Sequence, residues 1–204
     1  MMKGLMKDPF NLIIAGVGGQ GNLRLADIIG QALLSSGFLV AIGDTLGGAQ
    51  RGGSVASQIR ISRETRYGPY IPEGQADIIL GMEPIETLRV LTKYGSPLTA
   101  VITSTRPISS VDLFGKRANY PSIDVILNSI RELAGKVWII DAMSEALSLG
   151  KPVFANMILI GVLVGTGLLP LQIESIEEQL RLSSGAEAEE NLTAVKKGLV
   201  MVAK

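Results

Sequence analysis

Apolar residues recur along this chain at two spacings, one typical of strands and one typical of amphipathic helices. Residues 12–15 are wholly apolar and predict a buried strand, and 23–36 follow with apolar positions three and four apart, which is helical spacing. Gly37 stands where a glycine commonly ends a helix. The same patterns predict strands over 38–42, 55–62, 77–82, 98–103 and 136–141, and helices over 84–94, 122–134, 142–149, after 153, over 171–182 and over 191–202.

The order of these elements indicates the fold class. Strands and helices alternate through most of the chain, which favours a layered α/β fold with a mainly parallel sheet. We expect a single domain, because 204 residues suit one domain and no repeat or linker interrupts them. Residues 55–62 place Ile59 and Ile61 on one face and polar residues on the other, which predicts a half-buried strand near a sheet edge. Residues 104–120 show no period and predict a long loop.

Composition excludes several classes of function. The chain has no cysteine and no histidine, so it can build no disulfide, iron–sulfur cluster, Cys/His zinc site or Ser-His-Asp triad. General-base chemistry could fall only to Asp, Glu, Lys or Tyr. Basic and acidic residues both number 19, which leaves no basic field for nucleic acid or anionic lipid. Any redox centre that this protein uses must therefore come from another chain.

The apolar runs and the start of the chain predict a cytoplasmic protein. Residues 1–10 contain two lysines but no apolar signal-peptide core, and we expect them to be flexible. The longest apolar run, 153–170, is short for a membrane span and contains Asn156, so it predicts a buried helix. Its Gly161 and Gly165 predict close packing in the core. An apolar chain with zero net charge also favours a permanent partner.

The first glycine-rich turn raises the question of a dinucleotide site. Gly16, Gly18 and Gly21 form G-x-G-x-x-G between a predicted strand and a predicted helix, which is the layout of a dinucleotide-binding turn. Backbone N–H groups at such a helix start can face a phosphate. Asp44, after the second predicted strand, stands where an acid binds the ribose in NAD enzymes. A tight turn that needs glycine for its backbone alone explains the pattern too, so both interpretations stay open.

A second glycine-rich stretch, within 43–62, changes this interpretation. The glycine pairs 47–48 and 52–53 lie around Gln50, Arg51 and Ser54, a feature that a dinucleotide-binding domain does not need there. Two such loops at neighbouring strand ends predict one crevice, in which Arg51 can pair bidentately with phosphate or carboxylate. A glycine-rich connection with Arg51 on the surface is the alternative. The predicted walls are Gly18, Gly19, Gln20 and Gly21 on one side, and Gln50, Arg51, Gly52, Gly53 and Ser54 on the other.

The two glycine stretches together resemble a known family. The strings GVGGQG and GGAQRGGSVASQIRIS closely resemble the gamma-type subunit or domain of 2-oxoacid:ferredoxin oxidoreductases. Within that family, AQRGGSV is most like the beta subunit of indolepyruvate ferredoxin oxidoreductases. The resemblance covers almost the whole chain after residue 10. Further matching stretches lie at 67–89, 120–124, Asn156, 167–170 and 189–198.

This resemblance implies a fold and a function. The fold is a single three-layer α/β/α domain over 1–204 with a Rossmann-like sheet. The function is that of one subunit of an enzyme that oxidatively decarboxylates indolepyruvate, pyruvate or another 2-oxoacid to an acyl-CoA and passes electrons to ferredoxin. Thiamine diphosphate and the iron–sulfur clusters would lie in partner subunits. This chain would line the crevice and take part in coenzyme A handling, and the glycine turn would not be an NAD site.

Several polar residues outside the glycine loops have two interpretations each. Glu73, Glu83 and Glu86 are acid–base candidates, but an acid at a helix start more often stabilises the N-terminus, and we prefer that interpretation. Asn156 can reach a ligand or be a satisfied buried amide. Asp141 can lie at a ligand-binding sheet edge or cap the next helix.

Two rival hypotheses differ from the subunit hypothesis in class. One is a free-standing NAD-binding dehydrogenase, and the other is a ligand-free assembly module whose glycine loops serve only subunit contact. The subunit hypothesis predicts that the isolated chain is inactive and that NAD does not bind at 16–21. Its expected partners are the thiamine- and cluster-bearing subunits, ferredoxin indirectly, and a second copy when the chain is isolated. It assigns no catalytic residue and no metal site to this chain.

Overall fold

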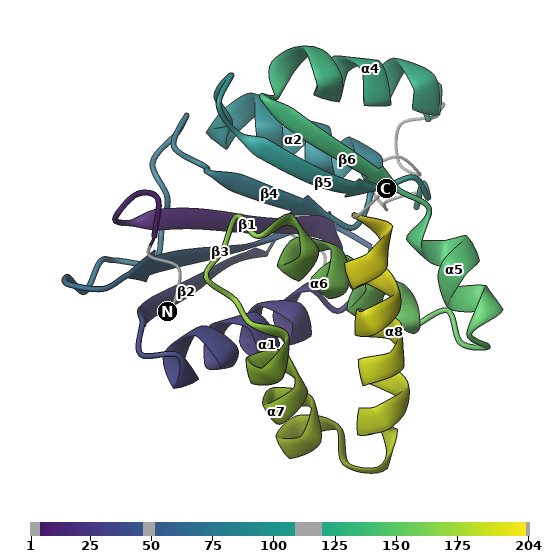
Figure 1. Cartoon of the computed structure of the whole chain (residues 1–204). Coiled ribbons are helices and arrows are strands. Elements are labelled where there is room, and N and C mark those ends of the chain that lie inside the picture. Colours follow the sequence, from purple (N-terminus) through teal and green to yellow (C-terminus); the bar gives the residue numbers. More distant parts are fainter. Residues whose placement is uncertain (1–4, 47–51, 109–119, 203–204) are drawn as a thin grey trace.

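The computed structural model describes residues 5–46, 52–108 and 120–202 and contains one six-stranded sheet with helices on both faces (Figure 1). The strands are β1 (Phe10–Val17), β2 (Leu39–Leu46), β3 (Ser54–Ser62), β4 (Ile78–Gly81), β5 (Ala100–Ser104) and β6 (Lys136–Ile140). The helices are α1 (Asn22–Ser35), α2 (Pro84–Tyr94), α4 (Ile123–Leu133), α5 (Ala142–Ser148), α6 (Phe154–Thr166), α7 (Ile173–Ser184) and α8 (Ala188–Met201).

The strand order β2-β3-β1-β4-β5-β6 makes the sheet mixed but mostly parallel. The neighbours β1, β4, β5 and β6 are parallel, whereas β3 is antiparallel to both β1 and β2. From β1 the chain passes through α1 to β2 on one side, and from β4 it passes through α2 to β5 on the other. The connections that leave β1 and β4 therefore lead to opposite sides of the sheet. The boundary between these two strands is a topological switch point, where open α/β sheets bind ligands.

Successive side chains of β1 enter two separate cores, because they alternate between the faces of the sheet. Leu12 and Ile14 pack in the core that α1, α6, α7 and α8 cover. Ile13 and Ala15 pack in the core that α2 and α4 cover. Figure 1 shows α2 and α4 above the sheet and α1, α6, α7 and α8 below it. The predicted three-layer α/β/α architecture is confirmed.

The ends of several elements follow from local sequence. Pro84 is the first residue of α2, and Gly95 follows its last turn, as predicted. Gly37, after α1, has a φ of 81°, a left-handed conformation that glycine adopts without strain. β2 continues past residue 42, because it pairs with β3 along its whole length. Of the predicted flexible start, residues 1–4 lie outside the described residues.

β3 is buried on both faces, so the prediction of a half-buried strand is wrong. Gln58 and Ser62, which were expected to face solvent, are 2% and 1% exposed. The segment 63–77 covers this face, and Gln58 Oε1 accepts a hydrogen bond from Ile71 N at 2.7 Å. Polar side chains can face inward here because the covering segment supplies their hydrogen bonds. β3 lies next to the edge strand β2.

Glycines bring α6 and α8 into close contact. A Cβ atom on Gly161 would lie 1.9 Å from Val195 O, and one on Gly198 would lie 1.9 Å from Ile158 O. Gly165 also faces α8, with its Cβ position 2.9 Å from Leu199 O. The predicted close packing of the apolar run is therefore confirmed. Within the described ranges, every helix is too short or too polar to cross a membrane.

Candidate functional site

The first glycine turn follows β1 and leads directly into α1. Gly19 and Gly21 have φ values of 98° and 90°, which favour glycine, and Gly21 is the N-cap of α1. A Cβ atom on Gly16 would lie 2.8 Å from Gln20 Oε1 and would displace that side chain. That oxygen accepts a hydrogen bond from Val17 N at 2.6 Å. The side chain of Gln20 thus folds back and fixes the turn.

Gln20 also joins the turn to two other segments. Its Nε2 atom donates to Met82 O at 3.2 Å, which links the loops that follow β1 and β4. Its backbone oxygen accepts a hydrogen bond from Asn156 Nδ2 at 2.6 Å. Asn156, on α6, is therefore a satisfied amide that supports the turn, and it also lines the adjacent hollow.

The second glycine stretch lies beside the first one. Gly18 N donates to Gly53 O at 2.8 Å, and Gly52 N donates to Gly18 O at 3.1 Å, so the pairing of β1 with β3 continues into the loops. Ser54 Oγ donates to Glu86 Oε2 at 2.5 Å. The structure therefore brings together all the predicted site residues that it describes. Gln50 and Arg51 lie outside the described residues, and their roles stay predictions.

A hollow of about 320 Å³ opens on the β4 side of the first turn. It lies at the carboxyl ends of β1, β4 and β5, where the strand order switches. Arg106, an exposed residue after β5, contributes a cation to its lining. The other lining residues are Gly19, Gln20, Met82, Ser104, Ile108, Met143, Pro152, Val153, Ala155, Asn156 and Leu159.

A second hollow, of about 250 Å³, opens on the β3 side of the same turn. It is lined by Asn22 and Val55 together with the glycine turn. Asn22 is 3% exposed, and its Nδ2 atom donates to Val55 O at 3.1 Å. Within the described residues its Oδ1 atom has no hydrogen-bond partner. A buried acceptor without a hydrogen bond costs free energy, so a donor from a bound molecule would stabilise this site. The first glycine turn thus separates two hollows and borders both.

Glu83 anchors the wall of the larger hollow. It is 1% exposed, and its carboxylate accepts from Glu86 N at 2.8 Å, which caps α2 and confirms the preferred interpretation of this acid. The same carboxylate accepts from Ile108 N at 3.4 Å and from the hydroxyl of Tyr120. Burial, followed by the hydrogen bond to Glu83, raises the pKa of the Tyr120 phenol. Glu73, by contrast, is exposed and pairs with a lysine on the surface at 3.7 Å.

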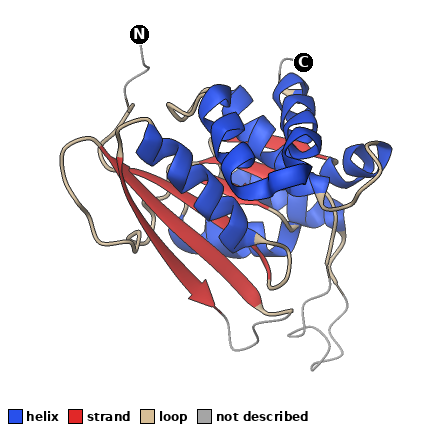
Figure 2. Ribbon diagram, turned by 90° about the horizontal axis from the view of Figure 1, so that it is seen from below, coloured by secondary structure: helices blue, strands red, loops and turns tan. Residues whose placement is uncertain are grey.

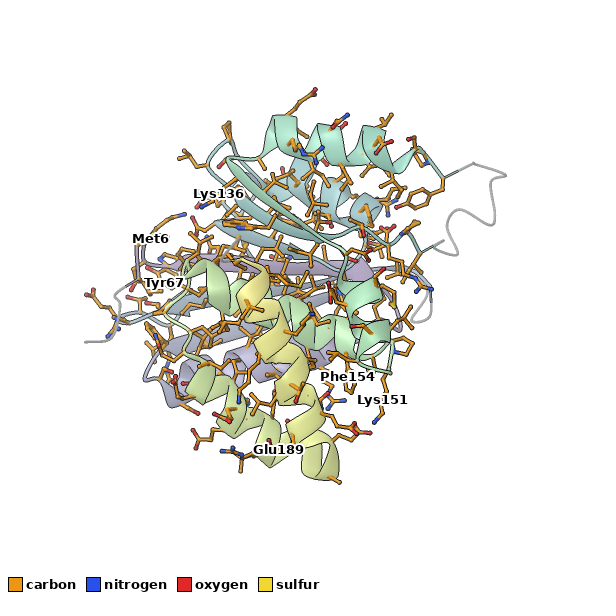
Figure 3. The ribbon with its side chains drawn as sticks, turned by 45° about the vertical axis from the view of Figure 1, so that its right-hand side comes forward. Met6, Tyr67, Lys136, Lys151, Phe154 and Glu189 are labelled. Carbon is orange, nitrogen blue, oxygen red and sulfur yellow. The ribbon has the colours of Figure 1, made fainter. Side chains whose placement is uncertain are left out.

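The start of α6, which forms another part of this wall, is held to α8. Lys151 hydrogen-bonds to Glu190 of α8, and this bond raises the pKa of the lysine. Lys151 also lies over the ring of Phe154, with Nζ 5.6 Å from the ring centre (Figure 3). Pro152 and Val153, which follow Lys151 directly, line the hollow.

The geometry around Asp44 differs from that of an NAD site. Asp44 lies inside β2 and accepts a hydrogen bond from Ser57 Oγ at 2.6 Å. β3 separates β2 from β1, whereas a dinucleotide-binding fold places the strand with the ribose acid next to the strand before the glycine turn. Asp141 caps α5 through Ser144 N at 3.1 Å, which agrees with the helix-cap interpretation.

Sequence reasoning missed the residues that reach the hollow from β4, β5 and α5. Met82, Ser104, Arg106 and Met143 show no motif of their own, and only the strand order brings them beside the glycine turn. A usable signal was their position, because each lies at or just after a strand end on the edge where α/β sheets bind ligands. Within the described residues, no group of three or more acidic side chains is placed to hold a metal ion.

Comparison with known proteins assigns the family. Residues 11–200 match the family described as pyruvate ferredoxin/flavodoxin oxidoreductase. The chain is 39% identical over 175 residues to indolepyruvate oxidoreductase subunit IorB of Pyrococcus horikoshii, which covers 85% of this chain and 86% of that protein. A keto/oxoacid ferredoxin oxidoreductase gamma subunit from Geobacter sulfurreducens has a TM-score of 0.68 at 19% identity, over 95% of this chain and 98% of that one.

A longer solved chain shares the same fold over part of its length. It is a 2-oxoglutarate:ferredoxin oxidoreductase from Magnetococcus marinus, solved with 2-oxoglutarate, coenzyme A and succinyl-CoA bound. The match has a TM-score of 0.74 at 21% identity and covers 97% of this chain and 31% of that one. The present chain therefore belongs to the pyruvate ferredoxin/flavodoxin oxidoreductase family.

Proposed function

We propose that this chain is a subunit of a ferredoxin-dependent 2-oxoacid oxidoreductase and that it lines the active-site crevice without holding thiamine diphosphate or a cluster. The observation that carries this role is the hollow at the β1–β4 switch point, which the first glycine turn borders in a member of this family. The clusters belong to partner subunits, because this chain has no cysteine or histidine to ligate iron. We assign thiamine diphosphate to a partner subunit too, on the resemblance to the family. The relatives at 36–39% identity favour indolepyruvate or a similar arylpyruvate as the substrate.

Coenzyme A is the molecule that best suits the proposed crevice. It supplies the thiol that takes up the acyl group. Its phosphates would lie against the N–H groups of Gly19 and Gly21 at the start of α1, because those of Gly18 and Gln20 already donate to Gly53 O and Val17 O. The first turn of α1 carries no acid, and Arg106 and Arg51 would add positive charge. Asn22 Oδ1 offers an acceptor for a ligand N–H or hydroxyl. We assign Gly18, Gly19, Gln20, Gly21, Gln50, Arg51, Gly52, Gly53 and Ser54 to this crevice.

Activity measurements test the subunit role. We expect the isolated chain to oxidise no arylpyruvate with an artificial electron acceptor, because it lacks both cofactors. The complex with its thiamine- and cluster-bearing subunit should oxidise indolepyruvate in a reaction that depends on coenzyme A. Oxidation by the isolated chain would overturn the proposal.

Arginine variants test the crevice. Arg51→Ala and Arg106→Met should each raise the KM for coenzyme A in the complex by about 10- to 100-fold, the loss expected for one charged hydrogen-bonding contact. In the isolated chain, Arg51→Ala should change the free energy of unfolding, measured by chemical denaturation, by no more than about 0.5 kcal/mol. Arg131→Met, on α4, is the matched control and should leave the KM unchanged. An Arg51 variant that unfolds several kcal/mol more easily but turns over normally would mean that Arg51 is structural.

A further inference from the structure

The outer edge of β2 pairs with no other strand of the described residues. Within the described ranges, β2 has β3 as its neighbour on one side and no strand on the other. Its eight residues span roughly 26 Å. Figure 2 shows β2 and β3 as the long pair at one side of the molecule. Such an edge presents N–H and C=O groups that pair readily with another extended segment.

A hollow of about 330 Å³ lies over the first half of this edge. On one side it is lined by Leu34 of α1 and by Val40, which packs toward the α1 core. On the other side it is lined by Arg60 and Tyr67, which face the segment covering β3. Because the hollow reaches both faces of β2, it must open across the edge of the strand.

Among the described residues, the cations in this hollow have no carboxylate partner. Arg60 is half-buried, and its described hydrogen bonds go to neutral oxygens, those of Asn11 at 3.3 Å, Gly68 at 3.3 Å and Tyr70 at 3.4 Å. Arg66 also lines the hollow and is exposed. The ion pairs formed among the described residues include neither arginine. A carboxylate placed between them would gain charge-assisted, bidentate hydrogen bonds.

We propose that the outer edge of β2 receives an extended, carboxylate-bearing segment of the thiamine-bearing partner subunit. The segment adds to the sheet as a further strand and places an acidic side chain between Arg60 and Arg66. Main-chain hydrogen bonds supply affinity, and the two arginines select the acidic segment and set its register. The existence of this partner rests on the proposed function. Arg60 lies at the opposite end of β3 from Ser54, roughly 20 Å away, so this contact is separate from the glycine turns.

A second copy of this chain suits the edge less well. The only acid of β2 is Asp44, which pairs with Ser57 and therefore faces the same core as Ile14. Arg60 faces the other side of the sheet. Opposite residues of paired strands share a face, so an antiparallel β2–β2 pair would place Asp44 on the wrong side to reach Arg60. β2 of a second copy therefore does not supply the carboxylate in such a pair.

Hydrogen exchange and a charge reversal test this docking surface. Those amides of 39–46 that do not bond to β3 should exchange at least about tenfold more slowly in the assembled complex than in the isolated chain, because new main-chain bonds engage them. Arg66→Glu should weaken assembly by about tenfold or more, since the carboxylate then meets a like charge. Arg66 is exposed and makes no hydrogen bond or ion pair among the described residues, so this variant should fold normally. Arg131→Glu, which changes the net charge equally on the exposed face of α4, should alter the affinity less than about twofold.

Three outcomes would overturn the inference. Unchanged exchange over 39–46 in a complex that is active with coenzyme A would exclude the docking surface and leave the proposed function intact. Protection that grows with the concentration of the isolated chain would show that a second copy occupies the edge. Failure of the chain to assemble with any thiamine-bearing subunit would remove the proposed function and this surface together.

Discussion

At the scale of single residues, Glu83 is a buried carboxylate that joins three segments beside the hollow between the glycine turn and β4. It caps α2 through Glu86 N and also holds Ile108 and Tyr120. The polypeptide that leaves β5 and the polypeptide that enters α4 are therefore fixed to the same side chain. Gln20 plays a comparable part on the other side of the hollow, where it links the loops after β1 and β4.

Tyr120→Phe should make the protein less stable and change how its stability depends on pH. The hydroxyl donates to a buried carboxylate, so its loss should cost about 1.5–3 kcal/mol of unfolding free energy. The pKa of Tyr120 is raised in the folded state, so the stability it contributes is fully present below the unfolded value of about 10 and declines as pH rises above it. Urea unfolding between pH 7 and 11 should show this decline in the native chain and a smaller one in the variant.

A matched tyrosine separates this effect from general alkaline unfolding. Tyr70 is 62% exposed, and its hydroxyl makes no described hydrogen bond. Tyr70→Phe should change the unfolding free energy by less than about 0.5 kcal/mol and keep the native pH profile. If both variants gave the same profile, the bond from Tyr120 to Glu83 would contribute nothing measurable.

At the scale of elements, α6 and α8 pack so closely that only glycine is accommodated at their contact. Gly161 of α6 meets the backbone of α8, and Gly198 of α8 meets the backbone of α6. α6 in turn carries Ala155, Asn156 and Leu159, which line the hollow beside β4. The position of this wall thus depends on a helix–helix contact that lies behind it.

Gly198→Ala should lower the unfolding free energy by about 1–3 kcal/mol. The new Cβ atom would lie 1.9 Å from Ile158 O, and a backbone oxygen cannot rotate away, so the two helices must separate. This cost exceeds the gain of up to about 1 kcal/mol that alanine brings to a helix interior. Urea unfolding of the isolated chain measures the difference. Gly68→Ala, where no atom lies within 4 Å of the Cβ position, is the control and should stay within about 0.5 kcal/mol.

At the scale of the whole molecule, the strand order decides how the glycine turn can be used. β3 separates β1 from β2, so Asp44 lies two strands away from the turn and is bonded to Ser57. The switch point instead lies between β1 and β4, and the hollow lined by Gln20 and Met82 opens there. The arrangement favours a ligand that spreads toward β4 and β5 over one that spreads toward β2.

NAD and NADH should therefore not bind to the isolated chain at micromolar concentrations. Isothermal titration calorimetry should give no saturable heat with either nucleotide, and Asp44→Ala should give the same result. A micromolar dissociation constant that Asp44→Ala abolishes would instead favour the dehydrogenase hypothesis. The assembled complex, titrated with coenzyme A, is the positive control for a nucleotide-bearing ligand.

Local patterns predicted most elements well, and their failures have physical causes. The strong period of 122–134 gave α4, and Pro84 with Gly95 gave the ends of α2. The alternation in β3 gave a strand, but it could not show that 63–77 folds over the polar face and satisfies Gln58. Periodicity shows which side chains are polar, but it does not show which distant segment supplies their hydrogen-bond partners.

The sequence by itself determined the α/β class, the glycine turn before α1, the absence of any cluster ligand and the resemblance to one family. These depend on residue type and on spacing over short distances, which the chain order preserves. Only the tertiary structure decided the strand order, the inserted β3, the carboxylate of Glu83 that joins three segments, and the hollow between the glycine turn, β4 and α6. Each of these depends on contacts between residues far apart in the chain, whose partners are chosen by packing and burial and not by local pattern.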